Sequence, residues 1–177
     1  MEFPNNNPNI ALRQMANTTK ISTRPVKMVF TNRVRGKGLG QWQDRALAAE
    51  MCRQLETCEV KSFHKSVFAR EIRQYAFLLC VHGGGIDPNP NLFQALIAGV
   101  IPIIAPFPAQ SMYDDLPVLI TDGNWTNINS TYFSRKFLAA KMEEFAPYFE
   151  DENKRAHVLE RLTMQYWWGK VEASLRV

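Results

Sequence analysis

The segment HGGGIDPNPN, residues 82–91, contains residue types that are suited to binding a phosphorylated ligand. Gly83, Gly84 and Gly85 have no side chains, so their backbone amides can approach a ligand closely. A helix that begins just after them would add unpaired N–H groups, which favour an anion. The pattern is neither GxGxxG nor a P-loop, because no Gly-Lys-Ser/Thr follows. A sharp turn at the end of a strand therefore explains the three glycines equally well.

Polar side chains in and around this segment are candidates for contacts with a ligand. Asp87 precedes the expected helix, where a carboxylate either caps the helix or binds a sugar or ribose hydroxyl. Asn91 and Gln94 follow near the start of that helix, and the Gln94 amide can bond a hydroxyl or face solvent. His82 is the histidine placed where chemistry could occur, although a lone histidine is more often a structural hydrogen-bonding group. We assign His82 and Asp87 as the candidate catalytic residues.

Other reactive groupings are weak in this sequence. No Ser or Cys nucleophile is paired with His82, and the histidines and cysteines do not cluster as metal ligands. Asp114 and Asp115, in SMYDDLPVLI, could act as acids or bind a metal, but a turn before a strand explains them more simply. We therefore expect no metal site.

Positive charge is concentrated in the first half of the chain. Residues 20–73 contain twelve Lys or Arg against five Asp or Glu, whereas residues 74–134 contain four Asp and no Lys or Arg. Arg33, Arg35 and Lys37 lie in the glycine-containing stretch RVRGKGLGQ, residues 33–41. They are the nearest cations for a diphosphate, and the alternative is a set of solvated surface charges.

Apolar runs alternate with helical patterns along the chain. Strands are predicted over 26–32, 58–64, 75–81, 99–106 and 117–121, and helices over about 47–55, 65–74 and 91–98. Gly99 stands where a helix would stop. Apolar spacing predicts a further helix from Phe133 to Phe145 and a longer one from Val158 to Leu175.

This alternation predicts an α/β fold with an open, mostly parallel sheet of about five strands and helices on both faces. If the strand order is 2-1-3-4-5, the first and third strands are neighbours at the switch point, where ligands bind in such sheets. The cationic loop and the glycine segment would then face each other across one crevice. We expect a polar arm over residues 1–24 and a Rossmann-like domain over 25–177.

Composition bounds the class of protein and its surroundings. The 177 residues are 46% hydrophobic, enough for one folded domain, and no signal peptide or membrane-spanning run is evident. An odd number of cysteines, Cys52, Cys58 and Cys80, suits buried thiols better than a disulfide framework. We expect a cytoplasmic location, or the Golgi lumen if an upstream anchor is missing. The sequon at Asn124 matters only in a secretory lumen.

The tryptophan pair Trp167 and Trp168 is predicted to pack against the sheet or against a missing partner domain. No basic stripe accompanies the pair, so we expect no nucleic-acid binding.

An ordered set of motifs over about fifty residues carries a resemblance to a known family. The stretch YAFLLCVHGGGIDPNPNLFQALIAGVIPIIAPFP, followed by YDDLPVLITDGNW, resembles the conserved region of exostosin-like and related virus- and alga-type glycosyltransferases. Their pattern has an aromatic-Glu-Ala-Leu helix, where this chain has Phe93 and Gln94 in place of Trp and Glu. Residues 26–56 are compatible with the first strand, loop and helix of the same domain.

The resemblance implies the carboxy-terminal, donor-binding half of a GT-B glycosyltransferase. Its substrates would be a nucleotide-diphosphate sugar and a glycan acceptor, with no further cofactor required. By position, Gly83–Gly85 would approach the diphosphate or sugar, and Asp87 would orient the donor. Gln94 removes an expected carboxylate, and 177 residues leave room for one of the two GT-B domains. The chain would therefore be a fragment that lacks its N-terminal domain, a subunit that works with a partner, or a reduced relative.

Two other functions stay open on the sequence. The chain could be a non-catalytic nucleotide-sugar-binding or regulatory module, which the Gln94 departure favours. It could also be a flavodoxin-like domain that binds a small phosphate ligand.

Overall fold

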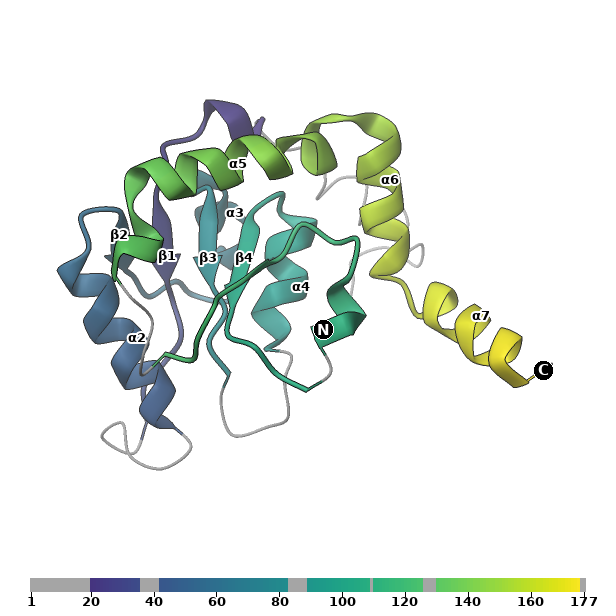
Figure 1. Ribbon diagram of the computed structural model, residues 1–177, viewed down its shortest axis with the longest axis horizontal. Helices are drawn as coiled ribbons and strands as arrows, with labels where there is room; N and C mark the ends of the chain where they lie inside the picture. The colour runs from purple at the N-terminus through teal and green to yellow at the C-terminus, as the bar shows by residue number, and fades with distance from the viewer. Residues whose placement is uncertain (1–19, 36–41, 83–88, 109, 126–129, 176–177) are drawn as a thin grey trace.

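A five-stranded, all-parallel sheet forms the centre of the molecule, as seen in the computed structural model (Figure 1). The structure describes residues 20–35, 42–82, 89–108, 110–125 and 130–175. The strand order is β2-β1-β3-β4-β5. The bounds are β1 Met28–Phe30, β2 Cys58–Val60, β3 Phe77–Leu79, β4 Ile101–Ile104 and β5 Leu119–Ile120.

Helices cover both faces of the sheet. Figure 1 shows α2 and α5 on one face and α3 and α4 on the other. Right-handed crossovers place α2 opposite α3 and α4, because the chain moves along the sheet in one direction from β1 to β2 and in the other from β2 to β3 and from β3 to β4. The bounds are α2 Gln43–Gln54, α3 Phe68–Glu71, α4 Pro90–Ile97, α5 Arg135–Glu150, α6 Glu152–Arg161 and α7 Met164–Leu175. Short 3₁₀ turns are η1 Ile21–Thr23, η4 Ile72–Gln74, η5 Gln110–Tyr113 and η6 Ser130–Phe133.

The two central strands are apolar on both faces. β1 pairs with β2 on one side and with β3 on the other, so that Met28 lies beside both Cys58 and Phe77. No residue of β1 or β3 is more than 1% exposed. This burial explains why both strands are continuous hydrophobic runs rather than alternating ones. The predicted fold class and the order 2-1-3-4-5 are confirmed.

Gly99 ends α4 as predicted. Its φ is 70°, and its N–H donates to the Leu96 carbonyl at 3.2 Å, the arrangement of a helix that stops on a left-handed residue. The next amide, of Val100, donates to Ala95 at 2.9 Å. The chain then turns directly into β4.

Two buried arginines complete the hydrogen bonding at this end of α4. Arg155 of α6 donates to the carbonyls of Leu96 and Ile97, both at 2.7 Å, and Arg24 donates to Gly99 at 2.8 Å. Burial, and next the nearby charge of Arg73, lowers the pKa of Arg24 to about 10. Burial, and next the charge of Arg24, lowers the pKa of Arg155 to about 10. Both side chains stay protonated at neutral pH and supply positive charge at the negative end of the helix dipole.

The cysteine prediction is wrong for two of the three residues. Cys52, near the end of α2, forms a disulfide with Cys58 at the start of β2. A spacing of six residues gave no sign of this pairing, but the turn between α2 and β2 brings the two Cα atoms to 5.0 Å, within disulfide range. Cys80 is a buried free thiol, as expected.

The predicted final helix is two helices. α6 ends at Arg161, and Thr163 begins α7 because its hydroxyl accepts the Tyr166 amide at 3.2 Å. The Trp pair does not pack on the sheet either: Trp168 is 62% exposed, and α7 stands away from the body of the molecule (Figure 1). The apolar spacing predicted one helix because apolar residues continue at helical spacing on both sides of the break between α6 and α7.

The expected polar arm over residues 1–24 falls mostly outside the described residues. Within the described part, Ile21 is 1% exposed and belongs to the core, and Arg24 is buried. The Ser22 amide also donates to the Glu150 carboxylate at 2.8 Å. The packed structure therefore includes residues before Pro25.

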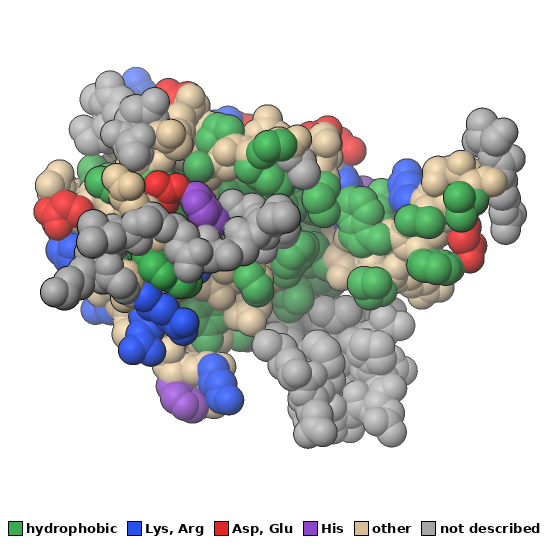
Figure 2. All heavy atoms as spheres, turned by 90° about the horizontal axis from the view of Figure 1, so that it is seen from below, with side chains coloured by type: hydrophobic (Ala, Val, Ile, Leu, Met, Phe, Trp, Pro, Cys, Tyr) green, Lys and Arg blue, Asp and Glu red, His purple; other side chains and the backbone are tan. Residues whose placement is uncertain are grey.

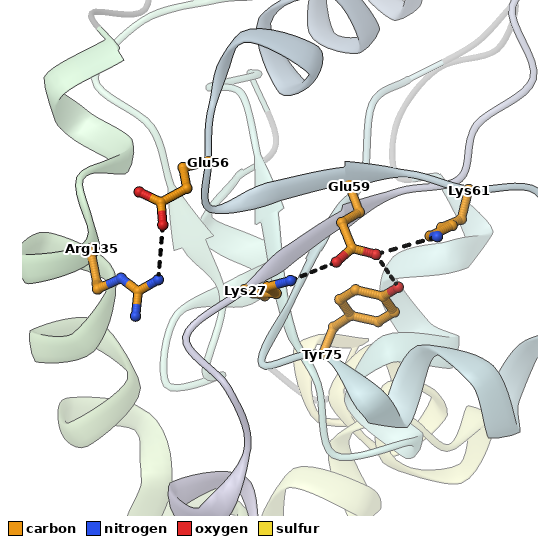
Figure 3. Close-up of polar contacts among 6 residues, drawn as sticks. All are labelled: Lys27, Glu56, Glu59, Lys61, Tyr75 and Arg135. Carbon is orange, nitrogen blue, oxygen red and sulfur yellow. Dashed lines mark hydrogen bonds and ion pairs between the residues drawn. The ribbon is translucent and has the colours of Figure 1, made fainter.

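A charged cluster joins the edge strand β2 to residues that come just before β1 and β3 (Figure 3). Glu59 accepts hydrogen bonds from Lys27 at 2.7 Å and from Tyr75 at 2.9 Å, and Lys61 lies 3.5 Å away. The hydrogen bonds from Lys27 and then Tyr75 lower the pKa of Glu59 from 4.5 to about 2. Burial, and next the bond to Glu59, raises the pKa of Tyr75 to about 12. Charged groups on an edge strand also discourage pairing with another chain.

The Glu59 cluster predicts a pH-dependent contribution to stability. Because the pKa of Glu59 is lower in the folded state, its contribution is complete above about pH 4.5 and is lost as the pH falls through about 2. Glu59→Gln should reduce the free energy of unfolding by about 1 kcal/mol at pH 7, after allowance for solvent screening. Urea unfolding at several pH values should show this difference shrinking below pH 4.5.

Glu56→Gln is the matched control for this prediction. The Glu56–Arg135 ion pair is long, 3.4 Å, and its carboxylate is 88% exposed, so its loss should not measurably change stability (Figure 3). Equal effects of the two substitutions, or an effect of Glu59→Gln that does not vary with pH, would contradict the assignment.

The arginine contacts predict a large loss of stability for Arg155→Met. The substitution leaves the Leu96 and Ile97 carbonyls without their donor at a buried helix end, which should cost about 3 kcal/mol. Lys154→Met, at the exposed neighbouring position on α6, should change the free energy of unfolding by less than about 0.5 kcal/mol. Denaturant unfolding of both variants checks the contrast, which fails if they are equally stable.

Candidate functional site

The candidate site lies where β1 and β3 end side by side. Loops leave these two strands in opposite directions along the sheet, so the edge between them is the switch point at which open α/β sheets bind ligands. Arg33 and Arg35 follow β1 and are exposed, and His82 follows β3 with its side chain 33% exposed. Figure 2 looks onto this edge, where histidine, acidic and basic side chains lie close together.

Arg45 ties the two strand ends together. Arg45 lies in the first turn of α2. Because α2 follows β1, this helix begins at the same edge. The Nε of Arg45 donates to the His82 carbonyl at 2.9 Å and its Nη1 donates to the Arg33 carbonyl at 3.1 Å. One guanidinium thus fixes the backbone on both sides of the switch point.

The acidic partner of His82 is Asp44, which lies in the same first turn of α2 as Arg45. The Nε2 of His82 lies 3.2 Å from Oδ2 of Asp44, whose side chain is 24% exposed. A carboxylate that holds one ring nitrogen fixes the orientation of the imidazole, as in many sites where histidine transfers a proton or binds a ligand. The pair is accessible from solvent and sits at the point where a ligand of this sheet would bind.

An aromatic ring and a second arginine border the pair. Trp42, directly before α2, has the Arg45 guanidinium 5.0 Å from its ring centroid and that of Arg35 at 5.6 Å. Within the described part of the chain, no side chain caps the start of α2 at Trp42. Backbone N–H groups at an uncapped helix start attract anions, and the two guanidiniums add positive charge beside them.

Two oxygens at the end of β1 are buried without a described partner. Asn32 is 8% exposed, and neither its Oδ1 nor the Thr31 hydroxyl has a hydrogen-bond partner among the described residues. A buried acceptor without a donor costs about 1–3 kcal/mol, so such groups are usually satisfied by water or a ligand. Asn32 comes directly before Arg33, at the same switch point.

The start of α4 is closed by Asn89. Its side chain accepts the Asn91 amide at 3.0 Å and donates to the Val81 carbonyl at 2.7 Å, joining the helix start to the end of β3. Asn89 therefore has the capping position considered for Asp87. Asn91 and Gln94 are both half-buried on α4, with Gln94 in its second turn.

The structure brings together part of the predicted site. Arg33, Arg35 and His82 lie at one edge, and α4, with Asn91 and Gln94, begins from the same edge. Lys37, Gly83, Gly84, Gly85 and Asp87 lie outside the described residues.

Sequence reasoning missed the residues that organise this edge, which are Asn32, Trp42, Asp44 and Arg45. The signal available for the last three was QWQDR at residues 41–45, where a polar stretch with an acidic residue opens a helix after a glycine loop. Asp114 and Asp115 are part of a turn before β5, as the simpler interpretation held. Asp115 has a φ of 65°, and the Asp114 carbonyl accepts from Arg161.

Hollows in the surface lie near and far from this edge. One of about 550 Å³ is lined by Val34, Gln43 and other α2 residues, next to the site. A larger open groove, of about 1010 Å³, lies between α6 and α7.

The described residues contain no group of three or more His, Cys, Asp or Glu that could hold a metal ion. No helix in the described part of the chain has both the length and the apolar character to span a membrane.

Comparison with known proteins does not assign the chain to a family. No protein-family model matches it, and no curated protein sequence matches it either. The function of the β1–β3 edge therefore has to be argued from its own groups.

Proposed function

We propose that the β1–β3 edge binds a nucleotide-diphosphate sugar and that the chain is a glycosyltransferase or the donor-binding domain of one. The observation that carries the proposal is the Arg45 tie, which fixes both strand ends and gathers Arg33, Arg35 and the His82–Asp44 pair at the switch point. An anionic ligand with hydroxyl groups suits this combination of cations, an oriented imidazole and buried acceptors.

The roles of the residues follow from their chemistry. Arg33 and Arg35 are exposed cations next to the uncapped start of α2, where they would bind the diphosphate and stabilise its charge as it leaves. The buried Asn32 Oδ1 would accept from a hydroxyl or an amide N–H of the donor. His82, oriented by Asp44, would form a hydrogen bond to the sugar end of the donor, where the reaction takes place.

A second candidate function is a nucleotide-binding module without transfer activity. Gln94 favours it, because the glycosyltransferase pattern that this region resembles has a carboxylate there. An amide can bond one ribose hydroxyl, but it lacks the charge that strengthens two such bonds. Donor binding is common to both functions, and turnover separates them.

Donor binding is predicted to depend on the exposed arginines. Calorimetry with UDP, GDP and their sugar conjugates at up to millimolar concentration should detect binding that weakens as salt is raised. The double variant Arg33→Gln, Arg35→Gln should bind at least tenfold more weakly, because it loses two charges beside the diphosphate.

Arg53→Gln is the matched control for this prediction. Arg53 is an exposed cation in the last turn of α2, at the opposite end of the helix from Arg45. It should leave nucleotide affinity unchanged. Absence of heat with every nucleotide and nucleotide sugar, or equal losses in the control, would reject the proposed site.

Turnover is predicted to depend on Asp44 more than donor affinity does. Asp44→Asn keeps the shape of the side chain but removes the charge that orients His82, so donor hydrolysis or transfer to a glycan acceptor should slow at least tenfold. The donor dissociation constant should change less than threefold. Binding without any turnover in the unmodified chain would establish the second candidate function instead.

A further inference from the structure

The last helix, α7, is attached to the rest of the protein only near its start, as far as the described residues show. None of its described residues is buried, and its main packing partner among the described elements is α6. Trp167 donates to the Arg161 carbonyl at 3.0 Å, and the Tyr166 ring lies over the Arg161 guanidinium at 5.6 Å. From there the helix extends away from the sheet (Figure 1).

One side of α7 is an exposed apolar stripe. Met164, Trp168, Val171 and Leu175 are 81%, 62%, 47% and 80% exposed, and they are four of the seven large exposed hydrophobic residues of the described chain. Their spacing of four, three and four residues places them on one face, as in the a and d positions of a coiled coil. Figure 2 shows hydrophobic side chains gathered along this helix.

The stripe is not the side that faces α6. The groove between the two helices is lined from α7 by Gln165, Tyr166, Gly169 and Lys170. At 100° per residue these positions lie on the side of the helix opposite the stripe. Contact with α6 therefore leaves the apolar residues uncovered.

Trp168, the largest side chain of the stripe, already has a partner for its one polar atom. The indole N–H of Trp168 donates to Glu172 at 2.7 Å, within α7 itself. Burying the ring against an apolar surface would therefore leave no polar atom without a partner, which is the usual obstacle to burying tryptophan.

We propose that α7 pairs with α7 of a second copy of this chain, antiparallel about a two-fold axis. In such an interface a residue and its opposite number exchange roles. The stripe is symmetric in its spacing, so Met164 of one copy meets Leu175 of the other, and Trp168 meets Val171. The bulky indole is thus matched to the smallest of the four side chains, which allows the helices to approach.

The size of the stripe places this dimer among the smallest specific interfaces. From their exposed fractions, the four side chains offer roughly 500 Å² per copy, so pairing removes about 1,000 Å² from water, near the lower limit for specific interfaces. A patch of this size is also about the largest that soluble monomers usually expose. We therefore expect a reversible dimer with a dissociation constant in the micromolar range.

Analytical ultracentrifugation of the full chain from about 1 to 200 µM tests this proposal. The unmodified protein should pass from monomer to dimer over this range, and Trp fluorescence should shift to shorter wavelength with it. Met164→Lys together with Leu175→Lys should weaken dimerisation at least twentyfold, because two charges would be placed in the apolar seam.

Ala173→Lys adds one positive charge on the opposite side of α7 and should leave dimerisation unchanged. A chain that stays monomeric at 200 µM would overturn the proposal and would leave the stripe for a different partner. Association that persists unchanged in the Met164→Lys, Leu175→Lys variant would also overturn it, since another surface would then be responsible. Nucleotide binding at the β1–β3 edge should be the same in both variants, so the two proposals fail independently.

Discussion

Parallel pairing of β1 with β3 is the constraint on which the rest of the structure depends. Because the two strands run parallel, the chain between them has to cross over the sheet, and it does so through α2, β2 and α3. The crossovers run outward in opposite directions from this pair, so α2 and α4 both begin at the ends of these strands. The helix starts, the strand ends and the polar side chains of the candidate site lie at one edge because of this one pairing.

Arginine has the same structural task at both edges of the sheet. At the edge where strands end, Arg45 satisfies carbonyls from two loops, and at the other edge Arg24 and Arg155 satisfy carbonyls at the end of α4. A guanidinium has five donors in a planar array, so one side chain can close several backbone groups from different segments. The basic composition of the chain thus reflects internal structure as well as any anionic ligand.

The sequence was sufficient for the parallel α/β fold and for the stop at Gly99, because both follow from local pattern and from general rules of crossover. The strand order 2-1-3-4-5 was one possibility, which the structure then showed. Contacts between elements that are distant in the chain could not be predicted from the sequence. The Asp44–His82 pair depends on the rotation of α2 about its axis, and the Cys52–Cys58 link depends on the path of a turn. The direction of α7 depends on a short break after α6, which apolar spacing does not reveal. Residues 83–88, six of the ten residues of the glycine segment that prompted the functional hypothesis, lie outside the described residues.

The disulfide between Cys52 and Cys58 makes the redox state of the surroundings part of the fold. β2 is an edge strand of three residues, held on one side only by β1. In an oxidising compartment its first residue is also joined covalently to α2, the helix that carries Asp44 and Arg45 at its other end. In a reducing compartment the disulfide would be replaced by two thiols, and the edge strand would be held by its pairing, by its packing against α2 and by the Glu59 cluster, without a covalent link.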